Sequence, residues 1–142
     1  MSIDTNKDLV RAFEAHINAR ELDEAIALLS PDFVDHTPGV GLPSGIDGVR
    51  AFFTMQYTGL PDNHRQSMEM IGEGDKVVHR LSGEGTHEGM LLGMPPTGRR
   101  VTWSCIDIWR VEDGRLVEHW VEADMLGLMQ QIGLVPPPRP IH

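Results

Sequence analysis

Two alternating segments on either side of Asp113-Gly114 constrain the fold of this chain more than any other feature. Asp-Gly is a preferred dipeptide for the two-residue type I′ turn of a β-hairpin. After the second segment the spacing of apolar residues changes from two to about 3.6, which indicates a strand that continues into a helix. The change falls at Asp124. Residues 101–133 therefore predict a β-hairpin followed by a helix.

A two-residue turn determines which side chains face one another across this hairpin. It pairs four residues of the first strand with four of the second: Trp109 with Glu118, Asp107 with Trp120, Cys105 with Glu122 and Trp103 with Asp124. One face then carries these tryptophans and carboxylates, and the other carries His119 among Ile and Val. The first face is either the outer surface of the sheet or the wall of an aromatic pocket, where burial raises the pKa of a carboxyl group. The pattern leaves both interpretations open.

The rest of the chain predicts helices first and strands afterwards. Apolar residues recur at helical spacing in three segments, 6–18, 21–30 and 44–57. Extended segments are predicted at 33–36, 66–71 and 76–85, and Gly- and Pro-rich loops at 39–45 and 86–98. This order indicates a single α+β domain over residues 1–142, with helices on one face of a curved sheet. Residues 134–142 are a Pro-rich tail that we expect to be loose or docked on a partner subunit.

Charge and composition limit the partners and the location of the chain. The formal net charge of −9 argues against binding to nucleic acid or to an anionic membrane surface. The single cysteine excludes an internal disulfide and fits a reducing compartment. No segment has the length of apolar residues that a membrane span needs. We therefore expect a cytoplasmic protein. The seven histidines lack the i, i+4 helix spacing of a zinc protease, so no metal site is expected.

Five side chains are candidates for chemistry. Asp124 either caps the final helix or acts as a general base at the end of the sheet, and one side chain can do both. Asp107 has aromatic neighbours on both strands, which favours a pocket acid. We expect His119 to be a core or interface histidine with satisfied hydrogen bonds, and Cys105 to be a buried, inert thiol. His36 is expected to be a solvent-facing turn residue.

Several segments resemble, in this order, the SnoaL-like polyketide cyclases, an ester-cyclase branch of the NTF2-like fold. They are FVDHTPG at 33–39, GIDGVRAFF at 45–53, GEGTHEGMLLGMPPTGR at 83–99 and DGRLVEHWVEADMLGLMQQIG at 113–133. The most specific signal is GTH…PPTG followed by EHW…D..GL..Q.G. The resemblance implies a cone-shaped α+β fold, in which three N-terminal helices, a curved antiparallel sheet and a short C-terminal helix enclose a deep apolar pocket.

The resemblance also implies an activity and a set of site residues. Characterised members close the last ring of an aromatic polyketide by intramolecular aldol addition without a cofactor, and an aspartate moves the proton. Asp124 matches that aspartate in the EHW…D motif. Asp107 is the second predicted catalytic residue, and the predicted substrate contacts are His36, His87, Trp103, His119 and Trp120. A small apolar or aromatic ligand and a homo-oligomer, either a dimer or a tetramer, are implied as partners.

Two other functions fit the same pocket. One is a module that binds a small apolar ligand without turnover, and the other is an NTF2-like isomerase or hydrolase. The chain also departs from the cyclases, because it has Cys105 and Asp107 where they have neutral or basic polar helpers. Two acids close together raise the pKa of one of them, which would aid or impair the chemistry.

Overall fold

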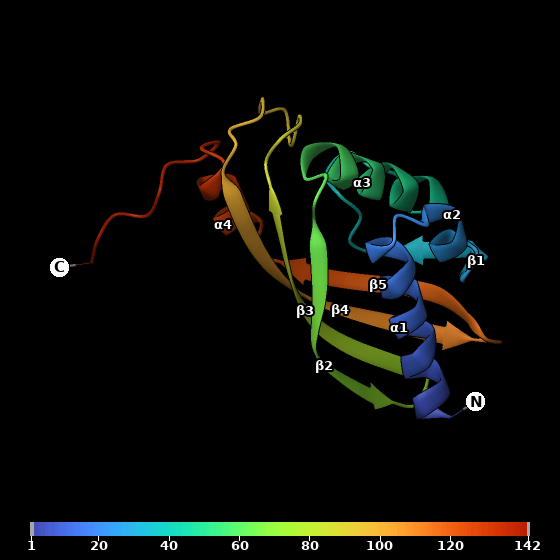
Figure 1. Ribbon diagram of the computed structural model, residues 1–142. Helices are drawn as coiled ribbons and strands as arrows, with labels where there is room; N and C mark the ends of the chain where they lie inside the picture. Colours follow the sequence, from blue (N-terminus) through green and yellow to red (C-terminus); the bar gives the residue numbers. More distant parts are fainter. Residues whose placement is uncertain (1, 142) are drawn as a thin grey trace.

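Figure 1 shows the computed structural model, which describes residues 2–141 and contains four helices and five strands in that range. In chain order the elements are α1 (Ile3–Asn18), α2 (Leu22–Ile26), β1 (Leu29–Asp35), α3 (Ile46–Gly59), β2 (His64–Glu73), β3 (Lys76–Thr86), β4 (Arg100–Glu112), β5 (Arg115–Ala123) and α4 (Met125–Gln131). The predicted α+β class is confirmed. His142, the last residue of the predicted tail, lies outside the described residues. None of the helices in residues 2–141 combines the length and hydropathy needed to cross a membrane.

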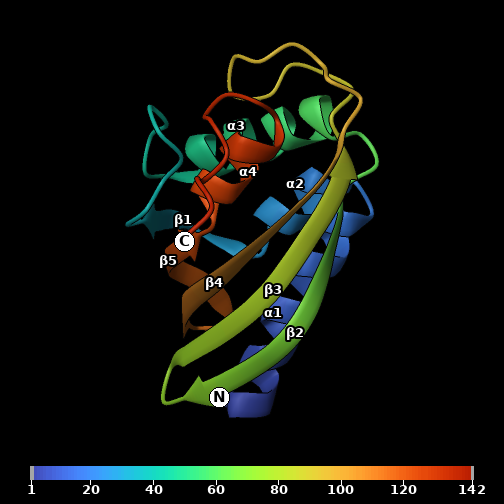
Figure 2. The ribbon, with the colours of Figure 1, turned by 90° about the vertical axis from the view of Figure 1, so that its left-hand side faces the viewer.

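The five strands form one curved sheet in the order β1-β5-β4-β3-β2. The pairs β2–β3, β3–β4 and β4–β5 are antiparallel, as predicted. β1 pairs parallel with β5, which corrects the expectation of a wholly antiparallel sheet. No hairpin joins these two strands, so no short turn dictates their relative direction. Helix α1 packs across the concave face against β2 and β3, and α3 covers one end of the sheet (Figures 1 and 2).

The second helix is shorter than its sequence pattern suggests. The spacing of apolar residues predicts a helix to residue 30, but α2 ends at Ile26. The chain already enters β1 at Leu29, which pairs with Leu116 of β5. Both leucines are buried. Burial of this pair in the sheet therefore outweighs the local helical preference of the segment.

The hairpin of β4 and β5 has the predicted turn but not the predicted register. Asp113 and Gly114 have φ angles of 51° and 74°, as a type I′ turn requires. Glu112 faces Arg115 across this turn. The next pairs show a shift, because Val111 faces Leu116 but Arg110 faces Glu118. Val117 is thus an extra residue on β5, and it forms a β-bulge.

The bulge reverses the faces of all later residues of β5. The predicted pairs of Trp109 with Glu118, Asp107 with Trp120, Cys105 with Glu122 and Trp103 with Asp124 are therefore wrong. The observed pairs are Trp109 with His119, Asp107 with Val121, Ile108 with Trp120 and Cys105 with Ala123. The odd-numbered residues of β4 are buried, so this face of β4 is not the outer surface of the sheet, and its role as a pocket wall stays a prediction. On β5 it is His119 that shares this inner face, whereas Trp120 lies on the outer face.

Two hydrophobic clusters fill the inner side of the sheet. The first surrounds Trp109, whose ring centroid lies 5.0 Å from that of Phe13 in α1 and 6.2 Å from that of Phe33 in β1. The second contains Trp103 and joins α4 to the loop before β4 through Leu128 and Leu91. The inward residues of β4 between these clusters are Cys105 and Asp107. A polar layer therefore separates two apolar ones.

Deletion of Val117 tests the importance of the bulge. Without the extra residue, β5 either moves the His119 side chain outward and the Trp120 side chain inward, or loses its pairing with β4. We expect the free energy of unfolding, measured with urea and tryptophan fluorescence, to fall by at least about 3 kcal/mol, the scale of a disrupted buried charge network. Val117→Ala keeps the bulge and serves as the matched control. Equal stability of the two variants would contradict this role.

Candidate functional site

Five charged side chains, each from a different element, form a chain of alternating charge between the two hydrophobic clusters. In order they are Glu14 of α1, Arg65 of β2, Asp107 of β4, His119 of β5 and Asp35 of β1. Arg65 donates to both carboxylate oxygens of Glu14, at 2.7 and 3.2 Å. The next gaps are 4.0 Å from Arg65 to Asp107, 2.9 Å from Asp107 to His119, and 3.2 Å from His119 to Asp35. We call this set the charge chain.

His119 is the cation at the centre of the inner face. Its Nε2–H donates to Asp107, and its Nδ1 pairs with Asp35. Burial alone would lower the pKa of His119, but these two carboxylates raise it to about 9. The imidazolium also lies against the Trp109 ring, with centroids 4.2 Å apart, where a cation is attracted to the ring face. The prediction of a core histidine with satisfied hydrogen bonds is confirmed.

Asp107 is almost completely enclosed, with 3% of its surface exposed. Its Oδ1 accepts from His119, and its Oδ2 has no hydrogen-bond partner among residues 2–141. Glu14, His79 and Asp107 each offer one atom that could coordinate a metal ion, and these three atoms lie within 4.8 Å of one another. The Arg65 guanidinium already neutralises Glu14 and approaches Asp107, however, so the protein supplies its own cation here.

Cys105 lies next to the charge chain on the same face of β4 and is buried. Burial, with a smaller contribution from the charge of Asp107, raises the pKa of its thiol to about 12. A thiol with this pKa is protonated at neutral pH and a poor nucleophile. The prediction that Cys105 is an inert thiol is confirmed.

Asp124 differs from the charged groups of the interior, because it is exposed at the junction of β5 and α4. Its Oδ1 accepts the backbone N–H of Gly127 at 2.9 Å, so the predicted N-cap role is confirmed. Its own N–H donates to the carbonyl of Ser104 in β4. Among residues 2–141, its second oxygen, Oδ2, has no hydrogen-bond partner. Asp124 therefore presents one free carboxylate oxygen from a fixed backbone position.

The structure separates His36 and Trp120 from the charge chain. The two rings stack on the outer face with centroids 4.6 Å apart and planes within 9°. His36 Nε2 bonds Glu118 at 2.6 Å, and the ammonium group of Lys76 lies 5.6 Å from the Trp120 ring centroid. The predicted position of Trp120 beside Asp107 is corrected by the bulge, which turns it to the opposite face.

The other two predicted substrate contacts lie toward the second cluster. His87 is fully buried, and its Nδ1 bonds the hydroxyl of Thr97 at 3.0 Å. Its backbone N–H donates to the carbonyl of Arg99, so it closes the base of the loop between β3 and β4. Trp103 lies over Gly83 of β3, where an added Cβ would come within 2.1 Å of the indole ring. Of these two, only Trp103 belongs to the cluster that contains α4.

Sequence reasoning missed three members of the charge chain, namely Glu14, Arg65 and Asp35. Only Glu14 carried a local signal, because an acid stands on the buried stripe of α1 beside Phe13 and Ile17. Arg65 lies 51 positions from Glu14 in the chain and at the start of a strand, so nothing local indicates the pair. The contact exists only after α1 has packed on β2.

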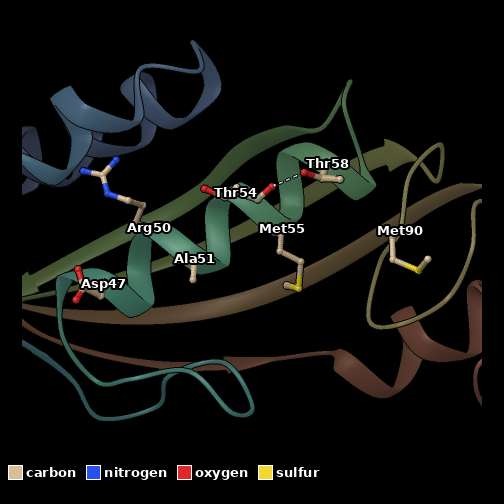
Figure 3. Close-up of a pocket in the computed structure, with 7 residues that line it drawn as sticks. All are labelled: Asp47, Arg50, Ala51, Thr54, Met55, Thr58 and Met90. Carbon is tan, nitrogen blue, oxygen red and sulfur yellow. Dashed lines mark hydrogen bonds between the residues drawn. The ribbon is translucent and has the colours of Figure 1, made fainter.

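Among the hollows on the surface of residues 2–141, two lie beside helices. One follows the exposed side of α3 (Figure 3), lined by Asp47, Arg50, Ala51, Thr54, Met55, Thr58 and Met90. The other lies between α4 and the start of the tail. Neither is lined by Asp107, His119 or Asp124. The deep apolar pocket that the resemblance implies stays a prediction.

The chain is similar in sequence and in structure to known proteins. The family model described as SnoaL-like polyketide cyclase matches residues 7–132. The chain is 30% identical over 134 residues to an aklanonic acid methyl ester cyclase of Streptomyces peucetius, with 91% of each chain covered. It is 26% identical over 124 residues to the nogalonic acid methyl ester cyclase of Streptomyces nogalater, covering 82% of this chain and 88% of that one. The solved structure of TsrD from Streptomyces laurentii matches with a TM-score of 0.85 at 31% identity, over 95% of this chain and 99% of that one.

The raised pKa of His119 predicts a loss of stability in mild alkali. The folded state holds the proton more tightly than an unfolded histidine with a pKa of about 6.5. The stabilisation is therefore complete below about pH 6.5 and is lost as the pH rises through about 9. We expect the free energy of unfolding to decrease by about 3 kcal/mol across this range, measured by urea unfolding at a series of pH values.

His119→Gln is the control for this pH dependence. The variant removes the titrating group, so its free energy of unfolding is expected to be low at all pH values and nearly flat between pH 6.5 and 9. Two adjacent carboxylates then lack their cation, which costs about 3–5 kcal/mol at neutral pH. A wild-type slope that persists in this variant would assign the titration to another group.

Proposed function

Because the chain belongs to the SnoaL-like polyketide cyclase family and has its NTF2-like α+β fold, we propose that it is a cofactor-independent cyclase that closes a ring in a small polyketide ester. The observation that carries the proposal is Asp124, a carboxylate with one fixed and one free oxygen. The resemblance implies that Asp124 matches the family's catalytic aspartate. The relatives named as methyl ester cyclases support the substrate class.

The proposed reaction is an intramolecular aldol addition. Asp124 removes a proton from a carbon acidified by neighbouring carbonyl groups, and the resulting enolate attacks a ketone carbonyl of the same molecule. A carbon–carbon bond forms as the carbonyl becomes an alkoxide. Protonated Asp124 then returns the proton to this oxygen, so that product and substrate are isomers and no redox partner is needed.

In this proposal the charge chain holds Asp124 in place and does not itself transfer a proton. Both nitrogens of His119 are occupied, and Asp107 is paired with it in the interior. Their contacts hold β5 against β1 and β4, and Asp124 follows the last residue of β5. We therefore propose Asp107 and His119 as positioning residues. Trp103 is the predicted substrate contact best supported by the geometry, because α4, which Asp124 caps, packs against its cluster.

Asp124→Asn separates the chemistry from the helix cap. Asn is as good an N-cap as Asp, so the free energy of unfolding is expected to change by less than about 0.5 kcal/mol. Loss of the proton-transferring group should lower kcat at least about 100-fold. The assay follows conversion of aklanonic acid methyl ester and other anthraquinone-type esters to products of unchanged mass, by liquid chromatography and mass spectrometry.

Asp113→Asn provides a matched control, since Asn-Gly fits the same type I′ turn at the other end of β5. It should retain wild-type kcat. Unchanged turnover in folded Asp124→Asn would refute the catalytic assignment. Ligand binding without any product, in both the wild type and the variant, would instead support the non-catalytic binding module.

A further inference from the structure

The tail beyond α4 forms an exposed arm, whose first residues, Pro136–Pro138, border the hollow beside α4. Leu134 and Val135 are anchored, because both N–H groups donate to the carbonyl of Met129. Residues 136–141 are all exposed, and among residues 2–141 no hydrogen bond or ion pair joins them to the rest of the protein. We call residues 136–141 the arm. Figure 1 shows it leaving the body beside α4 and running away from α3.

The arm is stiff and apolar, with one charge. Its sequence, PPPRPI, contains four prolines, which favour the extended polyproline II conformation. Six residues at about 3.1 Å each span roughly 19 Å. Arg139 is its only charged residue, and it has no ion-pair partner among residues 2–141.

The groove along α3 has matching properties. Its apolar lining residues are Ala51, Met55 and Met90 (Figure 3). From Asp47 to Thr58 it follows 11 residue steps of helix, or about 16 Å. It contains two charged groups, of which Arg50 is paired with Asp23. Asp47, at one end, has no ion-pair partner among the described residues.

Polarity and charge thus agree between the two surfaces, and we place Arg139 at Asp47. Residues 136–138 then lie along the part of the groove that contains Ala51, and Pro140 and Ile141 extend past Asp47. When Arg139 lies at Asp47, Pro136 lies about 9 Å further along, close to Thr54 at about 10 Å.

The arm cannot reach the groove of its own chain without reversing direction. Three consecutive prolines fix φ at positions 136–138, so the arm itself does not turn back. The residues before it are anchored to α4. We propose that the arm of one copy lies in the α3 groove of a second copy, so that two chains exchange arms in a homodimer.

Disulfide cross-linking between different chains tests the exchange directly. Chains carrying only Thr54→Cys are mixed with differently tagged chains carrying only Pro136→Cys and oxidised mildly. We expect a linked pair containing both tags, since a disulfide requires Cα atoms within about 7 Å. Cys105 does not compete, because it is buried and its pKa is raised to about 12.

Asp32→Cys replaces Thr54→Cys as the control, because Asp32 is exposed on β1 and outside the groove. It should yield less than a tenth of the linked pair. Equal yields would overturn the proposal. The double variant Thr54→Cys/Pro136→Cys shows whether the disulfide forms within one chain or between two chains. A disulfide formed only within single chains would also overturn the proposal.

Charge reversal tests the polar contact by sedimentation equilibrium of the full chain. Asp47→Lys and Arg139→Glu should each raise the dimer dissociation constant at least tenfold, and the double variant should restore it to within about threefold. Asp32→Lys, a matched change elsewhere, should leave it unaltered. A wild type that remains monomeric at all concentrations, or single variants that dimerise as tightly as the wild type, would refute the arm exchange. These measurements do not depend on turnover, so they stand apart from the proposed cyclase activity.

Discussion

The imidazolium of His119, held between Asp35 and Asp107, is the interaction on which the rest of the structure depends. It joins β1, β4 and β5, and through Asp107 and Arg65 it reaches β2 and α1. Buried charges are tolerated only when paired, since an unpaired one costs several kcal/mol. Each charge in this chain has an opposite neighbour, so all five elements must be in place before every member is paired. The charge chain therefore selects one arrangement of helices and strands. The two hydrophobic clusters supply most of the stabilisation.

The same pairing leaves His119 without a free nitrogen for proton transfer. A group whose hydrogen-bonding atoms are all occupied has no free site for a substrate, and this is the state of His119. Asp124 is the opposite case, because it is exposed, fixed through one oxygen and free at the other. The resemblance to the cyclases leads us to propose Asp124 as the general base, and its exposure and its free oxygen are compatible with that role. Asp107, which the sequence pattern favoured as a pocket acid, is paired with the internal cation His119.

Local chemistry made much of this fold predictable. Asp113-Gly114 indicated the turn, the change of period at Asp124 indicated the strand–helix junction, and apolar spacing located three helices and most strands. The bulge was not predictable in this way, because Val117 and Val121 look alike as strand residues. Its position follows from which side chains the assembled interior accepts, and the interior required His119 between two carboxylates from other strands. Arg65 and Glu14 were hidden for the same reason, since their pairing arises only between elements far apart in sequence.

The bulge also links the fold to the proposed chemistry. By turning His119 inward, it lets Asp35 and Asp107 hold β5 from both sides. The segment after Asp35 extends this contact, because His36 N–H donates to the carbonyl of His119 and Thr37 Oγ1 accepts the N–H of Val121 at 2.7 Å. Ala123 pairs with Cys105, and Asp124 N–H donates to Ser104. The strand is thus restrained residue by residue up to the carboxylate that follows it. A general base needs such restraint, because proton abstraction is sensitive to small displacements of the reacting atoms. Removing the bulge would therefore misplace Asp124 even though Val117 lies seven positions before it.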